Sequence, residues 1–354
     1  MNEFYCFLQQ LKMNPTSVFA LATVTQVDGS AYRHVGAKML FAANGERYGL
    51  ISGGCLEDDL AHHATEVIAS FITKSVSYDL RSEDDLGWGQ GAGCNGKIKV
   101  YVEPLQWNDE WSVVMDLLDQ TKKVLMVNGI EGEHSGARLF LGEDGSVFGN
   151  VSKESLVSLG YQYQSQLTSF QYLESETIKT NFTIEWLEPD DILYIFGGGP
   201  DVEPIVARTA EFGFKPVVID PREDRCQTNY FPKASLLVSE HPERFLEGNN
   251  MKANSYVLIM THSFMKDQKI LEYFLENQPK YLGILGPRRR TERLIDSAPI
   301  PSWVHSPIGL DIHAEGAEEI SISVLAELIK VRHESRQQQR GRNPIQIITN
   351  INPT

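Results

Sequence analysis

The chain has 354 residues, of which 42% are hydrophobic, and this length and composition indicate two domains with one core each. The formal net charge of -15 at pH 7 disfavours a broad surface for nucleic acid or anionic lipid, so we expect neither as a partner. No apolar run approaches the ~20 residues that a membrane-spanning helix needs. The N-terminal segment has no basic region and the pattern of an amphipathic helix, so we expect no signal peptide and a cytoplasmic location.

The chain has four cysteines, Cys6, Cys55, Cys94 and Cys226, and none of them forms a C-x-x-C pair. This spacing disfavours a structural zinc site, and in a reducing compartment we expect all four to be thiols. Cys6 and Cys226 have ordinary surroundings and are expected to be small buried residues. Cys55 and Cys94 lie in glycine-rich turns, which is a less usual place for a cysteine.

The N-terminal half predicts an α+β domain over residues 1–188. Apolar runs at 18–27, 38–41 and 97–102 indicate strands. One helix is clear, because six apolar residues share one face at helical spacing: Leu56, Leu60, Ala64, Val67, Ile68 and Phe71.

An internal duplication is predicted in this half, with β-hairpin units at 18–60 and 123–155. Residues 36–52 and 136–152 align without a gap. Five identical residues recur in the same order, Gly36, Ala37, Gly45, Gly49 and Ser52 in the first copy and Gly136, Ala137, Gly145, Gly149 and Ser152 in the second, and Lys38 is matched by Arg138. Chance similarity of two hairpins is the alternative. After the shared serine only the first copy continues Gly-Gly-Cys, which indicates a separate purpose for the turn that holds Cys55.

The segment Ser52–Glu57 leads from a predicted strand into the helix that begins near residue 56. Unpaired backbone N–H groups at a helix start attract anions and favour the thiolate form of Cys55. Gly53 and Gly54 would let a ligand approach the main chain closely. The carboxylates that follow, beginning with Glu57, oppose a thiolate. A tight turn with an inert cysteine therefore stays open as the alternative.

A second glycine-rich segment, residues 87–96, has five glycines and places Cys94 near its end. Such a loop would wrap a ligand with main chain, and an idle loop before a strand is the alternative. Arg33 and Lys38 are candidate anion contacts in an otherwise acidic protein. For each of them alone, a solvated surface cation is the alternative.

The C-terminal half predicts a Rossmann-like, doubly wound parallel sheet over residues 189–340, followed by a tail at 341–354. Strands are expected at 192–196, 217–220, 236–238, 256–260 and 281–285, and helices near 267–277, 287–297 and 315–333. The overall fold class is therefore α/β, with an α+β domain preceding the Rossmann-like one.

A nucleotide site is predicted at the start of this domain. Gly197, Gly198 and Gly199 follow the first strand, although Val202 stands where the dinucleotide fingerprint has a third small residue. Asp220 ends the second strand, where an acidic residue binds the ribose of NAD, and Arg222 is a candidate phosphate contact. Beyond two later strands lie His262, Arg288 and Arg289, which are candidates for contacting a phosphate or for supporting its contacts.

Taken together, these motifs resemble those of the XdhC/CoxI family of xanthine dehydrogenase accessory factors, over nearly the whole chain. The matching segments are GSAYRHVGAKML at 29–40, ISGGCLEDDL at 51–60, IFGGGPDVEPIV at 195–206, VVIDPRED at 217–224, THSFMKD at 261–267, LGILGPRRR at 282–290 and HSPIGLDI at 305–312. One departure is Cys94-Asn95-Gly96, where the family usually has Cys-Gly-Gly.

The resemblance implies a chaperone that binds the molybdenum cofactor in its molybdopterin form, in the context of purine catabolism. It implies that the cofactor is held while it is sulfurated and then inserted into a xanthine dehydrogenase-type apoenzyme. A cysteine desulfurase, that apoenzyme and a second copy of the chain, in a homodimer, are the partners implied. The expected molybdopterin contacts are Ser52, Gly53, Gly54, Cys55, Glu57, Cys94, Arg33 and Lys38, with Cys55 as the contact to molybdenum or sulfur.

Two other functions stay open. The Rossmann-like half alone favours an NAD(P)-dependent oxidoreductase, or a nucleotide-sensing regulatory protein that binds NAD(H) or another dinucleotide. No acid–base pair or nucleophile–base pair is evident in the sequence, and this favours a non-catalytic maturation factor over an enzyme.

Overall fold

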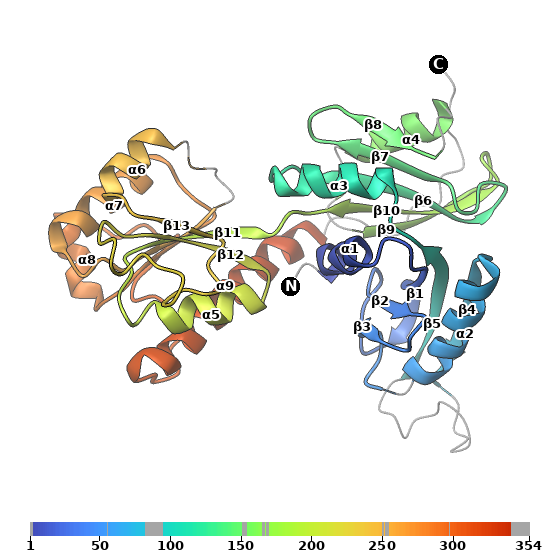
Figure 1. Cartoon of the computed structure of the whole chain (residues 1–354), viewed down its shortest axis with the longest axis horizontal. Coiled ribbons are helices and arrows are strands. Elements are labelled where there is room, and N and C mark those ends of the chain that lie inside the picture. Colours follow the sequence, from blue (N-terminus) through green and yellow to red (C-terminus); the bar gives the residue numbers. More distant parts are fainter. Residues whose placement is uncertain are drawn as a thin grey trace. The chain divides into compact units, whose positions relative to one another are not determined.

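The computed structural model describes residues 3–54, 56–81, 95–150, 154–164, 167, 170–249, 251, 255–296 and 298–340. The chain forms two compact units, one ending at Pro189 and the other comprising Asp190–Gln338 (Figure 1). The first unit contains two sheets and the second contains one, and each unit buries hydrophobic side chains of its own.

The first copy of the N-terminal unit is a five-stranded antiparallel sheet with two helices. Its elements are α1 (Glu3–Met13), β1 (Phe19–Ser30), β2 (Lys38–Ala42), β3 (Arg47–Gly49), α2 (Glu57–Ser70), β4 (Lys74–Asp79) and β5 (Asn95–Leu105). The strand order is β3-β2-β1-β5-β4, with the long strands β1 and β5 paired at the centre.

The second copy repeats this arrangement element by element. It consists of α3 (Asp109–Asp119), β6 (Val124–Gly132), β7 (Arg138–Gly142), β8 (Val147–Gly149), α4 (Glu154–Gln164), β9 (Phe170–Ser175) and β10 (Thr180–Leu187). Its strand order, β8-β7-β6-β10-β9, is that of the first sheet. The predicted duplication is therefore confirmed, and it extends beyond the hairpin to two helices and five strands.

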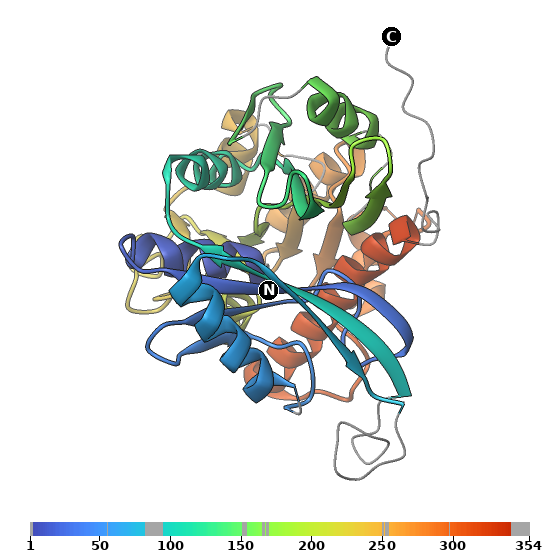
Figure 2. The ribbon, with the colours of Figure 1, turned by 90° about the vertical axis from the view of Figure 1, so that its right-hand side faces the viewer.

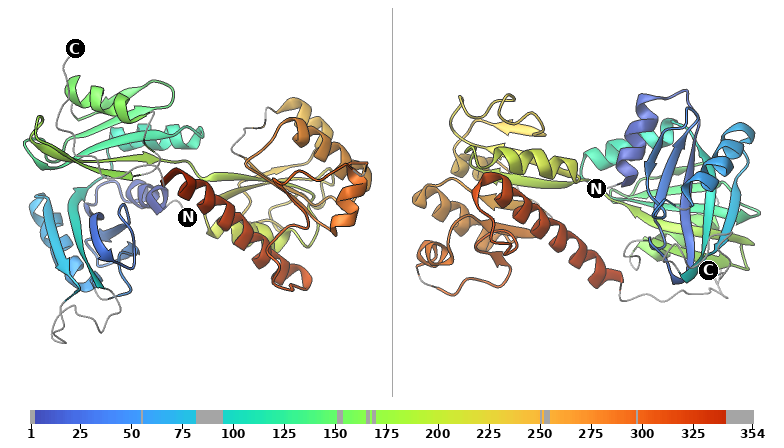
Figure 3. Two further views of the ribbon diagram at one scale, coloured as in Figure 1. Left: turned by 180° about the vertical axis from the view of Figure 1, so that it is seen from behind. Right: turned by 90° about the horizontal axis from the view of Figure 1, so that it is seen from below.

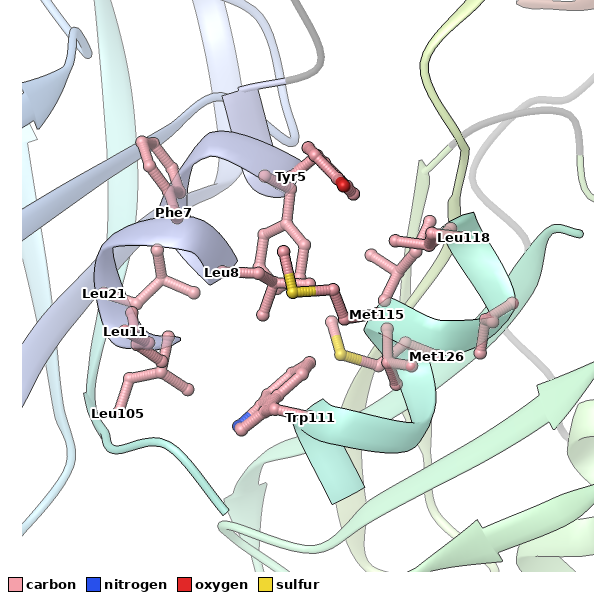
Figure 4. Close-up of a cluster of buried hydrophobic side chains, with 14 of the residues drawn as sticks. Tyr5, Phe7, Leu8, Leu11, Leu21, Leu105, Trp111, Met115, Leu118 and Met126 are labelled. Carbon is pink, nitrogen blue, oxygen red and sulfur yellow. The ribbon is translucent and has the colours of Figure 1, made fainter. Parts of the chain in front are cut away.

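The two copies share a hydrophobic core that α1 and α3 build together. Figure 4 shows the side chains of Tyr5 and Leu8 from α1 facing those of Trp111 and Met115 from α3. The ring of Trp111 lies 5.6 Å from that of Phe4, measured between centroids. Because each large side chain that is fully buried contributes roughly 1.5–3 kcal/mol, this cluster is a major source of stability for the paired copies.

Each sheet is covered on its other face by a helix of its own copy. Alternate residues of the first sheet, such as Ala22 and Met39, pack with Leu60 and Val67 of α2. The second sheet packs in the same way on α4, through residues such as Leu159. Figure 2 shows α2 and α4 on these outer faces. Because successive side chains of a strand point to opposite faces, each sheet contributes side chains to two hydrophobic cores.

The C-terminal unit is a six-stranded parallel sheet of order β13-β12-β11-β14-β15-β16. Its strands are β11 (Asp191–Phe196), β12 (Phe214–Ile219), β13 (Leu236–Val238), β14 (Tyr256–Ile259), β15 (Tyr281–Ile284) and β16 (Val304–His305). In chain order this is the 3-2-1-4-5-6 arrangement of a Rossmann fold, and it confirms the predicted doubly wound sheet.

Helices cover both faces of this sheet. One face packs on α5 (Glu203–Glu211) and α9 (Gly316–Arg340), and the other on α6 (Pro242–Gly248), α7 (Phe264–Glu276) and α8 (Arg288–Leu294) (Figure 3). The short elements α6 and β16, of seven and two residues, were not predicted from the sequence. Among the described residues, no helix combines the length and apolar character that crossing a membrane requires.

The segment HSPIGLDI is held to α9 by a buried carboxylate. Glu327 accepts hydrogen bonds from the hydroxyl of Tyr281 (2.5 Å) and from the backbone N–H of Gly309 (2.8 Å), and it pairs with Nδ1 of His305 at 2.9 Å. Burial raises the pKa of Glu327, but the hydrogen bonds from His305, Tyr281 and Gly309 outweigh it and leave the pKa below the ordinary value. This motif therefore fixes the last strand against the last helix.

Candidate functional site

The turn before α2 is closed by two of its own side chains. The carboxylate of Glu57 accepts hydrogen bonds from the backbone N–H groups of Ser52 (2.6 Å), Leu56 (3.2 Å) and Ile51 (3.3 Å), and from the Ser52 hydroxyl. Oγ of Ser52 in turn accepts from the N–H groups of Leu56 (3.1 Å) and Gly54 (3.3 Å). These bonds satisfy donors that a helix start would otherwise leave unpaired.

Glu57 is buried but ionised. Burial raises its pKa, yet the hydrogen bonds from the Ser52 side chain and from the backbone together lower the pKa below the ordinary value. The polar atoms of Ser52 and Glu57, which the sequence suggested as cofactor contacts, thus shape the turn. The two carboxylates that follow are also engaged, Asp58 by Arg47 at 2.7 Å and Asp59 by the Tyr78 hydroxyl at 2.6 Å.

The main chain of Gly53 and Gly54 is exposed at the tip of this turn. Gly54 has φ of +109°, and a Cβ added there would meet no atom within 4 Å. A Cβ on Gly53 would meet only the ring of Tyr32, at 3.9 Å. Tyr32 is itself 59% exposed. The main chain of Gly53 therefore lies beside the ring of Tyr32. Cys55, which follows Gly54 in sequence, lies outside the described residues.

The other cysteine-bearing segment is anchored next to the same region. Residues 82–94, including Cys94, lie outside the described residues. The first residue of β5, Asn95, pairs with Ser30 at the end of β1, two residues before Tyr32. The described flanks of both glycine-rich segments therefore converge on the stretch 30–33.

The two cations predicted to contact the cofactor are engaged in ion pairs. Nζ of Lys38 lies 2.8 Å from the Glu185 carboxylate, and the side chain is 5% exposed. Arg33 pairs with Glu3 at 2.9 Å and is half-buried. Lys38 therefore serves the contact between the two copies, because a buried ammonium that is already paired has no free charge for an anion.

A pocket of about 200 Å³ opens at the carboxyl ends of β11, β12 and β14. The strand order reverses between β11 and β14, which is where ligands bind in open α/β sheets. The lining residues are Gly197, Gly199, Pro200, Asp201, Ile219, Asp220, Pro221, Arg222, Pro242, Thr261, His262 and Lys266. The predicted nucleotide residues except Gly198 thus line one pocket together with His262.

Asp220 holds the glycine loop in place. Its carboxylate accepts from the N–H of Gly198 (2.7 Å) and from the backbone N, Nε and Nη2 of Arg222 (2.9, 2.9 and 2.7 Å). A carboxylate has about four acceptor positions, and four bonds fill them. Burial raises the pKa of Asp220, but the bonds from Arg222 and Gly198 outweigh it and lower the pKa. A ribose hydroxyl would have to replace one of these donors.

The later polar segments differ in what they contact. Nε2 of His262 lies 3.0 Å from the carboxylate of Asp201 at the mouth of the pocket. Arg288 and Arg289 are exposed. It is Arg290 that turns inward, with Nη2 2.6 Å from the buried carboxylate of Asp267, which also accepts from the N–H of Thr261 at 3.3 Å. This network ties α8 to the loop after β14.

Three residues near these sites were not predicted from the sequence: Tyr32, Asp201 and Lys266. Tyr32 directly precedes the candidate anion contact Arg33 and carries no charge that would mark it. Asp201 and Lys266 occur in the matching motifs, but their place in the pocket depends on the fold. Cys6 and Cys226, which were expected to be buried, are only half-buried, and burial raises the pKa of the Cys226 thiol. Within the described residues, no group of three or more His, Cys, Asp or Glu could hold a metal ion.

Comparison with known proteins assigns the chain to a family. A family model described as XdhC Rossmann domain matches residues 193–328, and one described as XdhC and CoxI family matches residues 16–79. A relative from Bacillus subtilis (strain 168), named as a probable subunit of xanthine dehydrogenase, is 38% identical over 334 residues, or 94% of this chain and 98% of the relative. The chain belongs to the XdhC and CoxI family. The resemblance noted in the motifs is thereby confirmed.

Two further proteins bear on the fold and the function. A relative from Escherichia coli (strain K12), named molybdenum cofactor insertion chaperone PaoD, is 22% identical over 323 residues, which is 88% of this chain and 83% of that relative. A solved structure described as a xanthine dehydrogenase from Bacillus halodurans is 37% identical, with a TM-score of 0.81 over 93% of this chain and 96% of that chain. The match supports the α/β fold over both units.

Proposed function

We propose that this member of the XdhC and CoxI family is a maturation factor for a xanthine dehydrogenase-type molybdenum hydroxylase. In this proposal it holds the molybdenum cofactor at the turn before α2, supports sulfuration of that cofactor and assists its insertion into the apoenzyme. The names of the relatives support the general role, since one is a molybdenum cofactor insertion chaperone and another is a probable part of a xanthine dehydrogenase.

The observation that carries the proposal is a difference between the two copies of the repeat. Seven residues, 50–56, separate Gly49 from the first residue of α2, whereas four, 150–153, separate Gly149 from the first residue of α4. The first copy therefore has three additional residues, the length of Gly53-Gly54-Cys55. Because α4 forms without them, the fold does not need these residues, and a separate purpose accounts for them.

The described residues of the turn have the chemical properties that binding the molybdenum cofactor requires. Molybdopterin is a phosphorylated pterin that carries molybdenum on soft thiolate ligands. The exposed main chain at Gly53 and Gly54 allows close approach, and the neighbouring ring of Tyr32 offers a face on which a flat heterocycle packs. Cys55 would supply a sulfur ligand for a soft metal. Arg33, which follows Tyr32 in sequence and is half-exposed and paired with Glu3, is the cation that we assign to the phosphate.

The partners in this proposal are those that the family resemblance implies. A cysteine desulfurase supplies the sulfur atom, and the apo-hydroxylase receives the finished cofactor. A second copy of the chain would form the homodimer. None of these partners requires a general acid–base pair in this chain. This agrees with a carrier function and not with an enzymatic one.

The test is the amount of cofactor retained on purification. Wild type, Cys55→Ser and the matched control Cys226→Ser are co-expressed with cofactor biosynthesis, purified without oxygen and assayed for molybdenum and pterin per protomer. We expect the cofactor to stay with the wild type and the control and to be lost from Cys55→Ser. Equal stoichiometry in all three proteins would refute a role for the turn in retention.

A nucleotide-sensing role for the C-terminal unit is a second candidate, favoured by the pocket at the reversal of strand order. Here a nucleotide bound near Gly197–Gly199 would regulate cofactor handling without being turned over. Purified protein is mixed with NAD⁺ or NADH, and partner affinity and absorbance are followed. A change in affinity without turnover supports sensing. Oxidation or reduction of the nicotinamide with a small substrate would favour the oxidoreductase alternative.

A further inference from the structure

The glycine loop of the C-terminal unit carries its own anion. In dinucleotide-binding folds the pyrophosphate lies against this loop and the start of the following helix. Here Oδ1 of Asp201 lies directly against Gly199, in the space that a Cβ on that glycine would overlap. Oδ2 of the same carboxylate lies 3.0 Å from Nε2 of His262. A carboxylate therefore sits beside the main chain that a pyrophosphate would need.

The first turn of α5 is acidic as well. Glu203 begins the helix, and its carboxylate lies 2.6 Å from Nη2 of Arg225, which also donates through Nε to the carbonyl of Gly198 at 2.9 Å. Among the described residues, the partner found for the Asp201 carboxylate is the imidazole of His262, which is 61% exposed. Because Arg225 compensates the charge of Glu203, the negative charge next to the loop comes from Asp201, and it opposes a second anion there.

The opposite wall of the pocket has the complementary charge. Lys266, in the first turn of α7, lines the pocket and is half-buried. No carboxylate among the described residues pairs with it, whereas Lys269 on the same helix pairs with Glu243 at 3.3 Å. A phosphate entering the pocket would therefore be drawn to the end of β14, away from the glycine loop.

The size of the pocket agrees with a small ligand. Its volume of about 200 Å³ is below the roughly 300–1,000 Å³ of pockets that enclose drug-sized molecules. The acceptor positions of Asp220 are also occupied, so its carboxylate offers no open acceptor to the ribose of either a mononucleotide or a dinucleotide.

We infer that Asp201 is a specificity residue of the proposed nucleotide site. Its carboxylate takes the place of a phosphate at the glycine loop and excludes a pyrophosphate. The pocket consequently selects a mononucleotide whose single phosphate is bound by Lys266. This inference rests on the proposed nucleotide site and narrows it from a dinucleotide to a ligand with one phosphate.

Calorimetry on the full-length protein tests the inference with AMP, adenosine and NAD⁺ as probes. The variants are Asp201→Asn, which keeps the shape and removes the charge, Lys266→Ala, and Lys269→Ala as a control on the same helix. We expect the wild type to bind AMP more tightly than NAD⁺. Asp201→Asn should raise the affinity for NAD⁺ by on the order of tenfold and leave adenosine unchanged. Lys266→Ala should weaken AMP by about tenfold, and Lys269→Ala should not.

The possible results distinguish the role of Asp201 from the proposed nucleotide site on which it depends. If the wild type prefers NAD⁺, or if Asp201→Asn leaves the affinity for NAD⁺ unchanged, the role of Asp201 is overturned while the nucleotide site stands. If AMP binds equally well to Lys266→Ala, the place assigned to its phosphate is wrong. If no protein binds any of the three probes, the nucleotide site itself is overturned and the inference with it.

Discussion

Lys38 on β2 and Glu185 on β10 form a buried ion pair across the two copies of the N-terminal repeat, with Nζ and Oε2 2.8 Å apart. Its counterpart is Arg138 on β7, which lies 2.5 Å from the carboxylate of Glu103 on β5. Lys38 and Arg138 hold equivalent places in their copies, opposite Thr23 and Asn128 in the strand registers. The basic residue of each copy therefore binds the acidic residue of the other.

Removing one member of the pair should strongly destabilise the N-terminal unit. Lys38→Met leaves the carboxylate of Glu185 buried without compensation, and the expected cost is about 3–5 kcal/mol. The double variant Lys38→Met/Glu185→Leu removes both charges and should recover most of this loss. Urea unfolding, followed by the transition midpoint, measures both effects.

A matched control for this pair is Lys123→Ala. Lys123 pairs with Glu188 at 2.9 Å, but both side chains are partly exposed, and its loss should cost at most about 1 kcal/mol. A cost for Lys38→Met as small as that of the control would mean that the cross-copy pair does not hold the copies together.

The turn before α2 should weaken in acid because of Glu57. The folded-state pKa of Glu57 lies below its ordinary value of 4.5, so the carboxylate contributes stability that is present above that value and is lost as the pH falls through the folded-state pKa. Glu57→Gln cannot ionise, and its side chain accepts fewer hydrogen bonds. Each buried N–H group that is left without an acceptor destabilises the fold by about 1–3 kcal/mol. The gap in stability between wild type and variant should therefore narrow between about pH 6 and about pH 3. A gap that is constant across this range contradicts the assignment.

Gly54 offers a way to separate fold from function. Gly54 and Gly45 both have positive φ, +109° and +90°, and a Cβ at either would meet no atom within 4 Å. Alanine at each position is therefore strained but not clashing, and each variant should lose roughly 1–2 kcal/mol of stability. Only Gly54→Ala should also lower the molybdenum content of anaerobically purified protein. Equal molybdenum content in the two variants would argue against a ligand at this turn.

The arginines of α8 should differ sharply in their effect on the C-terminal unit. Arg290→Ala leaves the buried carboxylate of Asp267 without its charged donor and should cost about 1.5–3 kcal/mol. Arg288→Ala and Arg289→Ala remove exposed side chains and should change stability by less than about 0.5 kcal/mol. Thermal unfolding of the three variants ranks them, and a ranking led by Arg288 would contradict the role of Arg290 in this network.

Local sequence patterns by themselves determined the fold class. The apolar runs and the glycines between them predicted the parallel sheet, because a strand covered on both faces needs a continuous apolar run and a helix needs a face at 3.6-residue spacing. The shared glycines of residues 36–52 and 136–152 predicted the duplication, since positive φ at a turn restricts the residue type wherever the turn recurs. The same comparison of copies pointed to the Gly53-Gly54-Cys55 insertion.

The tertiary structure alone decided which charged groups are free to bind a ligand. Lys38 was a candidate anion contact, yet its partner Glu185 is 147 positions away in the chain. In the same way Asp220 accepts from the N–H of Gly198, 22 positions away, and Arg290 is turned inward onto Asp267 while its neighbours stay exposed. The physical reason is that an ion pair forms where the fold brings two side chains within about 4 Å, and this distance is set by packing between elements and not by any local pattern.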